Sequence, residues 1–293
     1  MQLQSPPHLF NFRLMRVYVG LCLLTLFVRH NAIADEPAFV HPGIAHTRAG
    51  IQRIKSKLDS LEEPWTSEWN QLKQSPDASL DWSPDPRAHV ERGPSNNPDI
   101  GSSEFDRDGT AAYTLALRWV LSGDEAYAQK SARIIDVWSA TLKTVTNHDA
   151  RLLIGMTGQK YCNAAEILRH TWDGWPESNQ EQFRSMLRNV WYPIIKDFYP
   201  SANGNWDASM MQTMIAMGIY LDDREMFQRA VDYFLEGEGT GMAANRSRDD
   251  FRVGRQDGVR EVRRSRSGRR SYSTLPWDAL MFRDLSAATS EWR

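Results

Sequence analysis

Apolar residues recur at every third or fourth position through most of the middle of the chain. One such stripe contains Tyr113, Leu117, Val120 and Leu121, and Asp124 follows it as the predicted N-cap of the next helix. The spacing is that of one face of an α-helix, and it predicts helices over residues 113–121, 127–142, 162–170, 177–198, 208–220 and 224–235. The turns between these helices are short, so successive helices should lie antiparallel. No stretch alternates strictly between apolar and polar residues, so no half-buried strand is predicted.

The pattern before residue 110 is less regular. Residues 41–43 (His-Pro-Gly) predict a turn, and Thr47 predicts the N-cap of a helix through 51–58. A second helix is predicted over 65–72. Five prolines between 76 and 98 then predict an extended loop, which is long for a compact domain and is therefore a candidate functional element.

The first 34 residues have the three parts of a secretion signal. Arg13 and Arg16 form a positive region, residues 17–28 are almost entirely apolar, and residues 32–34 (Ala-Ile-Ala) fit a signal peptidase site. The alternative is a membrane anchor, but about a dozen apolar residues are fewer than the ~20 that span a bilayer. We therefore predict a signal peptide over 1–34, a mature chain that begins at Asp35 without a membrane anchor, and a periplasmic or secreted location.

Composition adds few constraints. The chain has 293 residues, of which 41% are hydrophobic and 25% charged, and its net charge of -2 gives no bias toward nucleic acid. Signal cleavage would remove Cys22 and leave Cys162 without a partner for an internal disulfide. The 11 Trp and 11 Phe supply apolar surface for a core, and aromatic residues also line sugar-binding clefts.

The C-terminal part differs from the rest in its basic residues. Residues 246–293 contain 12 Arg and no Lys, whereas Lys and Arg are mixed upstream. One interpretation is a natural, disordered basic tail that binds anionic partners such as acidic polysaccharide. The other is translation from the wrong reading frame, which the abrupt change in composition favours and which resequencing of codons 236–250 would test. The predicted organisation is a helical domain over 35–241 and an Arg-rich tail over 242–293.

Several segments together resemble the alginate-lyase family of polysaccharide lyases. They are residues 39–44 (FVHPGI), 111–119 (AAYTLALRW), 122–128 (SGDEAYA), 163–168 (NAAEIL) and 203–207 (NGNWD), and the resemblance extends over about residues 38–240. It implies an α/α toroid, here all-α and incomplete because the domain is followed by the Arg-rich segment. It also implies β-elimination on a uronic-acid polymer such as alginate.

That reaction needs a donor that neutralises the substrate carboxylate, a base for the C5 proton and an acid for the leaving O4. It requires no cofactor. The resemblance makes Asn205, and next Asn203, the candidate donors, with Trp206 as a sugar-stacking residue. The alternatives are a plain turn at residues 203 and 204, an N-cap at Asp207, and a core position for Trp206.

Asn163, Tyr161 and Glu166 are further substrate-binding candidates on a predicted helix. The alternatives are a core position for Tyr161 and a surface ion pair of Glu166 with Arg169 or His170. Four histidines are predicted to have surface or structural roles: His41, His46, His148 and His170. No His-x-x-x-His or paired-Cys spacing indicates a metal site.

The chain departs from the family pattern after residue 241. The family has a block of the Gly-Arg-Asp-Gln-x-His type there, whereas residues 254–258 read Gly-Arg-Gln-Asp-Gly, and no His follows His170. The predicted lyase therefore lacks its usual base and acid and should be impaired. The alternatives are a non-catalytic binding protein for anionic polysaccharide, a structural helical domain, or a glycoside hydrolase that uses two of Asp106, Asp108 and Glu166.

Overall fold

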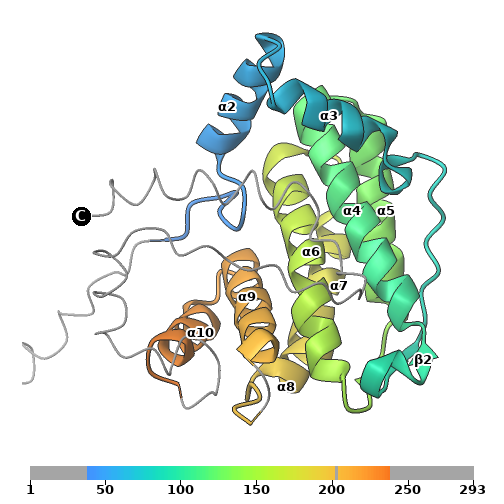
Figure 1. Ribbon diagram of the computed structural model, residues 1–293, viewed down its shortest axis with the longest axis vertical. Coiled ribbons are helices and arrows are strands. Elements are labelled where there is room, and N and C mark those ends of the chain that lie inside the picture. Colours follow the sequence, from blue (N-terminus) through green and yellow to red (C-terminus); the bar gives the residue numbers. More distant parts are fainter. Residues whose placement is uncertain (1–37, 202–203, 238–293) are drawn as a thin grey trace, which may run out of the picture. The chain divides into compact units, whose positions relative to one another are not determined.

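The computed structural model describes residues 38–201 and 204–237, which form one predominantly helical unit from Phe39 onward (Figure 1). Its helices are α2 (Arg48–Asp59), α3 (Trp65–Gln74), η1 (Pro76–Ala78), η2 (Pro94–Asn96), α4 (Ser102–Ser122), α5 (Glu125–Thr141), α6 (Ala150–Thr171), α7 (Glu177–Met186), the π-helical η3 (Leu187–Trp191), α8 (Tyr192–Ile195), α9 (Gly204–Tyr220) and α10 (Arg224–Glu236). Among the described residues, none of the helices is both long and apolar enough to cross a membrane.

Three helices, α4, α6 and α9, lie side by side and run parallel to one another (Figure 1). Near their beginnings, Asp106 of α4 accepts a hydrogen bond from Thr157 of α6. Near their ends, Trp119 of α4 donates to Thr171 of α6, and Arg169 of α6 donates to the carbonyl of Tyr220, the last residue of α9. The three helices therefore start at one end of the unit and finish at the other.

The other long helices return along this inner layer. The α5 helix packs against α4, α10 packs against α9, and α7 packs against α5. Side chains of Thr47 and Asp124 cap α2 and α5 as expected, each accepting a hydrogen bond from a backbone N–H. Parallel inner helices connected by antiparallel outer helices form part of an α/α toroid. The all-α class and the antiparallel hairpins are thus confirmed.

Two glycines of α6 allow its close contact with α9. A Cβ atom on Gly158 would lie 2.6 Å from the Thr213 methyl carbon, and one on Gly155 would lie 2.9 Å from the backbone nitrogen of Met210. Both positions are therefore closed to any larger side chain unless the helices separate. Around this contact, the rings of Phe105, Tyr161 and Trp191 pack with centroids 5.2–5.8 Å apart, and all three are fully buried.

The sequence predicted no half-buried strand, whereas the structure has three short ones among the described residues. A small sheet of order β2-β1-β3 contains β1 (His89–Arg92), β2 (Asp99–Ile100) and β3 (Thr144–Thr146). The β1 strand pairs in parallel with β3, with Val90 opposite Val145, and antiparallel with β2. Strands of two to four residues are too short to show a period of two, and β1 occupies part of the segment predicted as a loop.

Three predicted helices also begin at least four residues earlier than expected. The α4 helix starts at residue 102 rather than 113, α6 at residue 150 rather than 162, and α9 at residue 204 rather than 208. The predicted signal peptide over 1–34 and the Arg-rich tail over 242–293 lie outside the described residues.

Candidate functional site

The N-terminal ends of α4, α6 and α9 meet at one end of the inner layer (Figure 1). The free N–H groups and the dipole of each helix give such an end a partial positive charge. Three parallel helices add their contributions at the same end. This end of the unit therefore favours a negatively charged ligand.

An aromatic cluster lies at this end. The rings of His148, Tyr199 and Trp206 pack edge to face. The centroid of the Trp206 ring lies 5.4 Å from that of each of the other two rings, whose own centroids are 6.4 Å apart. The guanidinium of Arg151 lies 5.1 Å from the Tyr199 ring. His148 is exposed and the other three side chains are half-buried, so the cluster faces solvent. Exposed aromatic faces beside a cation suit an acidic sugar.

His148 forms a dyad with the residue that follows it. Its Nδ1 lies 2.7 Å from Oδ1 of Asp149, whose side chain is only 9% exposed, whereas that of His148 is 52% exposed. The backbone of Asp149 is fixed in turn by a hydrogen bond to the carbonyl of Arg92 in β1. A carboxylate that holds Nδ1 orients the ring and leaves proton exchange with a ligand to Nε2. His148 has the geometry of a positioned general base.

Asp207 braces the same site from behind. Its Oδ1 accepts from the backbone N–H of Tyr199 at 2.9 Å, and its Oδ2 accepts from the hydroxyl of Tyr233 in α10 at 3.0 Å. The Tyr233 ring also stacks on Phe198 at 3.8 Å. Asp207 is 2% exposed, so this is a buried brace that joins α9, α10 and the segment that carries Tyr199.

The predicted site residues are only partly brought together. Asn205 is exposed in the first turn of α9, Trp206 belongs to the aromatic cluster, and Asn203 lies outside the described residues. Tyr161 is fully buried, and its hydroxyl donates to the carbonyl of Phe105. Tyr161 therefore takes the core position that the sequence left open.

Asn163 and Glu166 are also enclosed, and they hold the segment that precedes α2. Asn163 accepts from the backbone N–H of Ala45 at 3.0 Å, and Glu166 accepts from that of Gly43 at 2.9 Å. Both residues lie toward the end of α6, roughly 20–30 Å from His148 of the aromatic cluster at 1.5 Å per residue. They do not share a site with Asn205.

The carboxylates considered for a hydrolase have structural partners instead. Asp108 accepts from the indole N–H groups of Trp82 and Trp138 at 2.8 and 2.7 Å, and burial raises its pKa. Asp106 accepts from Thr157 and Lys160. Neither arrangement places two carboxylates across a cleft.

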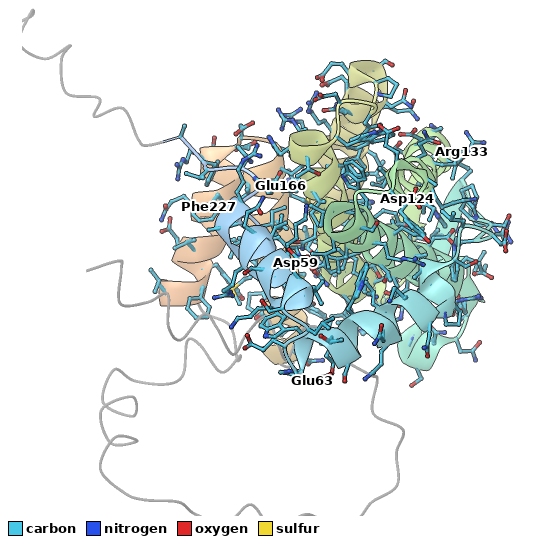
Figure 2. The ribbon with its side chains drawn as sticks, turned by 90° about the horizontal axis from the view of Figure 1, so that it is seen from above. Asp59, Glu63, Asp124, Arg133, Glu166 and Phe227 are labelled. Carbon is cyan, nitrogen blue, oxygen red and sulfur yellow. The ribbon has the colours of Figure 1, made fainter. Side chains whose placement is uncertain are left out.

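A second polar cluster surrounds Glu166 at the opposite end of the inner helices; Figure 2 labels this residue. His41 lies between two carboxylates, with Nδ1 2.7 Å from Glu166 and Nε2 2.9 Å from Asp222. Its ring stacks on that of His170 at 4.3 Å. Burial lowers the pKa of His41, but the hydrogen bonds to both carboxylates outweigh it and the net shift is upward. Burial lowers the pKa of His170 to about 4.

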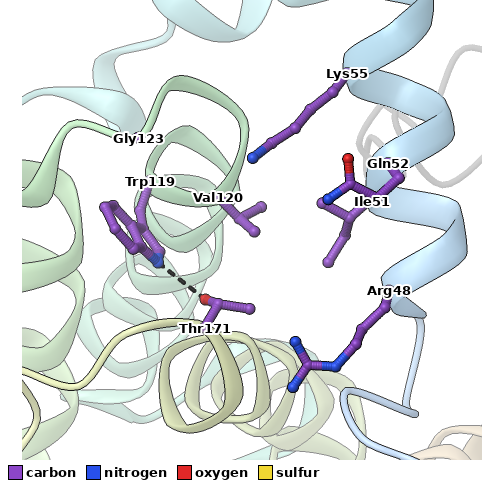
Figure 3. A pocket seen from close by; sticks show the side chains of 8 residues that line it. All are labelled: Arg48, Ile51, Gln52, Lys55, Trp119, Val120, Gly123 and Thr171. Atoms are coloured by element: carbon purple, nitrogen blue, oxygen red, sulfur yellow. Dashed lines mark hydrogen bonds between the residues drawn. The ribbon is translucent and has the colours of Figure 1, made fainter.

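A pocket of about 340 Å³ opens beside this cluster (Figure 3). The side chains of Arg48, Gln52 and Lys55 enter it from α2, and Trp119 faces them from α4. The Trp119 indole is held by its hydrogen bond to Thr171 at 3.0 Å. Two cations, an amide and an indole are suited to a sugar that carries a negative charge.

Comparison with known proteins assigns the chain to a family. The family model described as alginate lyase matches residues 51–266. This chain belongs to the alginate lyase family. The matched span begins in α2, contains His148, Tyr199 and Asn205, and extends beyond the domain boundary predicted at residue 241.

Among solved structures, the chain is similar to an alginate lyase from Bacteroides ovatus. The two are 15% identical with a TM-score of 0.44, over 67% of this chain and 65% of that one. The chain thus spans less than two thirds of that structure's length. No curated protein sequence matches.

His148 and Tyr199 were not among the sequence candidates. The signal that would have found them is the true start of α6, because Leu153, Ile154, Thr157 and Tyr161 continue the helical stripe backward. With α6 begun at residue 150, the triplet at 147–149 (Asn-His-Asp) stands at a helix entry, as residues 204–207 do for α9.

Proposed function

We propose that this chain is a polysaccharide lyase that cleaves a uronic-acid polymer such as alginate by β-elimination. The observation that carries the proposal is the His148–Asp149 dyad, which lies beside Trp206 and Tyr199 where three helix N-termini converge. The family supplies the reaction class, and this end of the inner layer supplies residue types that the reaction needs.

The elimination proceeds as follows. Asn205 and the helix N-termini neutralise the substrate carboxylate as negative charge builds at C5. His148 Nε2 removes the C5 proton, the C4–O4 bond breaks, and a C4=C5 double bond forms. The leaving O4 takes up a proton from a protonated side chain. Two side chains can serve as this acid: His148, which carries the abstracted proton, and the neighbouring Tyr199 with its hydroxyl group. Trp206 and Arg151 position the sugar ring.

The proposal also covers location and rate. Residues 13–34 support export to the periplasm or beyond the cell. The activity of this chain is reduced, because residues 254–258 do not match the family's His-containing block and that block supplies a further base or acid.

The test measures the ultraviolet absorbance of the unsaturated product when the full chain meets alginate or glucuronan. We expect a slow but measurable rate that falls at least about 100-fold in His148→Gln, since general base catalysis contributes 10²–10⁴-fold. Asn205→Ala should lose a similar factor. The control is Asn189→Ala, an exposed asparagine of η3 that should keep the wild-type rate.

Equal rates in wild type and His148→Gln would contradict this assignment of the base. Complete absence of product, with alginate still bound, would favour a second function. That function is non-catalytic binding of anionic polysaccharide, and the pocket of Arg48, Lys55 and Trp119 favours it. In that case Lys55→Ala should weaken oligo-uronate binding by about two- to fivefold, and His148→Gln should leave it unchanged.

A further inference from the structure

Three potential metal ligands come together at the end of the inner layer opposite the aromatic cluster. His41, Glu166 and His170 each place one ligand atom within 4.8 Å of the others. From this juxtaposition we propose that they bind one divalent transition-metal ion of the zinc class, as a His₂Glu site. This site lies outside the proposed catalytic end and plays a structural role.

Two of the ligand atoms are buried without a hydrogen-bond partner among the described residues. They are Oε2 of Glu166 and Nε2 of His170, which lie 3.5 Å apart. Glu166 is only 1% exposed, and an unpaired carboxylate oxygen at such a position is costly. Zinc bonds of about 2.0–2.1 Å in a tetrahedral site place neighbouring ligands roughly 3.3 Å apart. The observed separation is therefore close to that of a zinc ligand pair.

The surrounding hydrogen bonds orient the third ligand. Asp222 Oδ1 lies 2.9 Å from His41 Nε2, which is the carboxylate–histidine contact that commonly supports a metal-bound imidazole. The backbone N–H of Gly43 donates to Glu166 Oε1 at 2.9 Å and fixes that carboxylate. When the ion binds, His41 Nδ1 gives up its contact with Glu166 Oε1, releases its proton to solvent and becomes a ligand.

The position of the three ligands defines what the ion would do. Glu166 and His170 are one turn apart on α6, whereas His41 belongs to the segment that precedes α2. The ion would therefore join this segment to α6, beside the existing hydrogen bond from Ala45 to Asn163. His148 lies about 30 Å away along α6, too far to share a reacting group.

The experiment uses the full chain freed of metal with a chelator and then titrated with Zn²⁺ in a calorimeter. We expect one ion per chain and a melting temperature that rises with Zn²⁺ concentration. His170→Gln should weaken binding by more than 100-fold, and Asp222→Asn by about 10–100-fold, because the latter disturbs only the orientation of His41. The control is His89→Gln, an exposed histidine of β1 that should leave the affinity unchanged.

Titration of the unaltered chain with Co²⁺ gives a second readout that does not depend on whether any variant folds. We expect visible d–d absorption that saturates at one equivalent and disappears when Zn²⁺ is added. The proposal is overturned if neither metal gives saturable binding at one equivalent. His41, Glu166 and His170 would then form a hydrogen-bonded cluster and no metal site. It is equally overturned if folded His170→Gln binds Zn²⁺ as tightly as the wild type.

Discussion

His46 is a buried histidine whose protonation should make stability depend on pH. Its side chain is enclosed at 3% exposure, and it forms a hydrogen bond with the Tyr113 hydroxyl. Burial lowers its pKa from 6.5 to about 4. In the unfolded chain the imidazole keeps its ordinary value, so between these two values only the unfolded state takes up the proton. Stability is therefore full above about pH 6.5 and is lost as the pH falls toward 4.

The size of the effect follows from the two pKa values. A difference of about 2.5 units corresponds to about 3 kcal/mol of unfolding free energy over the whole window, of which roughly 2 kcal/mol is lost between about pH 7 and pH 5. Other groups also titrate there, including His170. The quantity to measure is thus the difference between the wild type and His46→Gln, which keeps a polar side chain of similar size but cannot be protonated.

Urea unfolding followed by tryptophan fluorescence gives the unfolding free energy of both proteins at several pH values. His46→Gln will cost some stability near pH 7, where the native histidine is neutral. Its deficit should shrink by roughly 2 kcal/mol on going to pH 5, because it escapes the penalty paid by the wild type. A deficit that stays constant within about 0.5 kcal/mol would refute the assignment of a buried neutral imidazole at this position.

Three further changes test the braces and contacts around the site, each by urea unfolding. Asp207→Ala removes the acceptor of two hydrogen bonds and should cost about 2–4 kcal/mol, with a parallel loss of any lyase rate. Gly158→Ala places a methyl group 2.6 Å from the Thr213 side chain and should cost about 1–3 kcal/mol; Gly50→Ala, in a more open position of α2, should change stability by less than about 1 kcal/mol. Asp124→Ala removes the N-cap of α5 and should cost about 1 kcal/mol, and no loss would show that the cap is replaced by solvent.

Helices with a continuous apolar stripe could be predicted from the sequence. Where a helix begins with small residues, its first residue could not be located. The α5 helix was found because Ile134, Ile135 and Trp138 give an unambiguous face. The start of α6 was missed because Gly155 and Gly158 lie in its first turns and glycine is a poor helix former. The glycines are there for contact with α9, and tertiary contact is not visible in local periodicity.

The same limit governs the candidate site. Asn205 and Trp206 were identified because a short motif carries them. His148 and Tyr199 come from separate segments, and they meet Trp206 only through the parallel arrangement of α6 and α9. Glu166 was assigned to the substrate site because the sequence predicts the helix that carries it. The sequence does not show which residues of the neighbouring segments lie beside Glu166. Its actual partners, His41 and the backbone N–H of Gly43, are more than 120 residues away in sequence.

Parallel inner helices explain why two sites of different character occupy opposite ends of the unit. Helix N-termini attract anions and helix C-termini attract cations. The chain follows this rule at both ends. Asn205 and His148 are exposed where α9 and α6 begin. Where these helices end, Arg48 donates to the carbonyl of His170, and Arg169 donates to that of Tyr220. A metal cation held by His41, Glu166 and His170 would add positive charge at the end where the helix dipoles favour it. An acidic sugar at the other end would gain from the same dipoles, so one helix orientation serves both proposals.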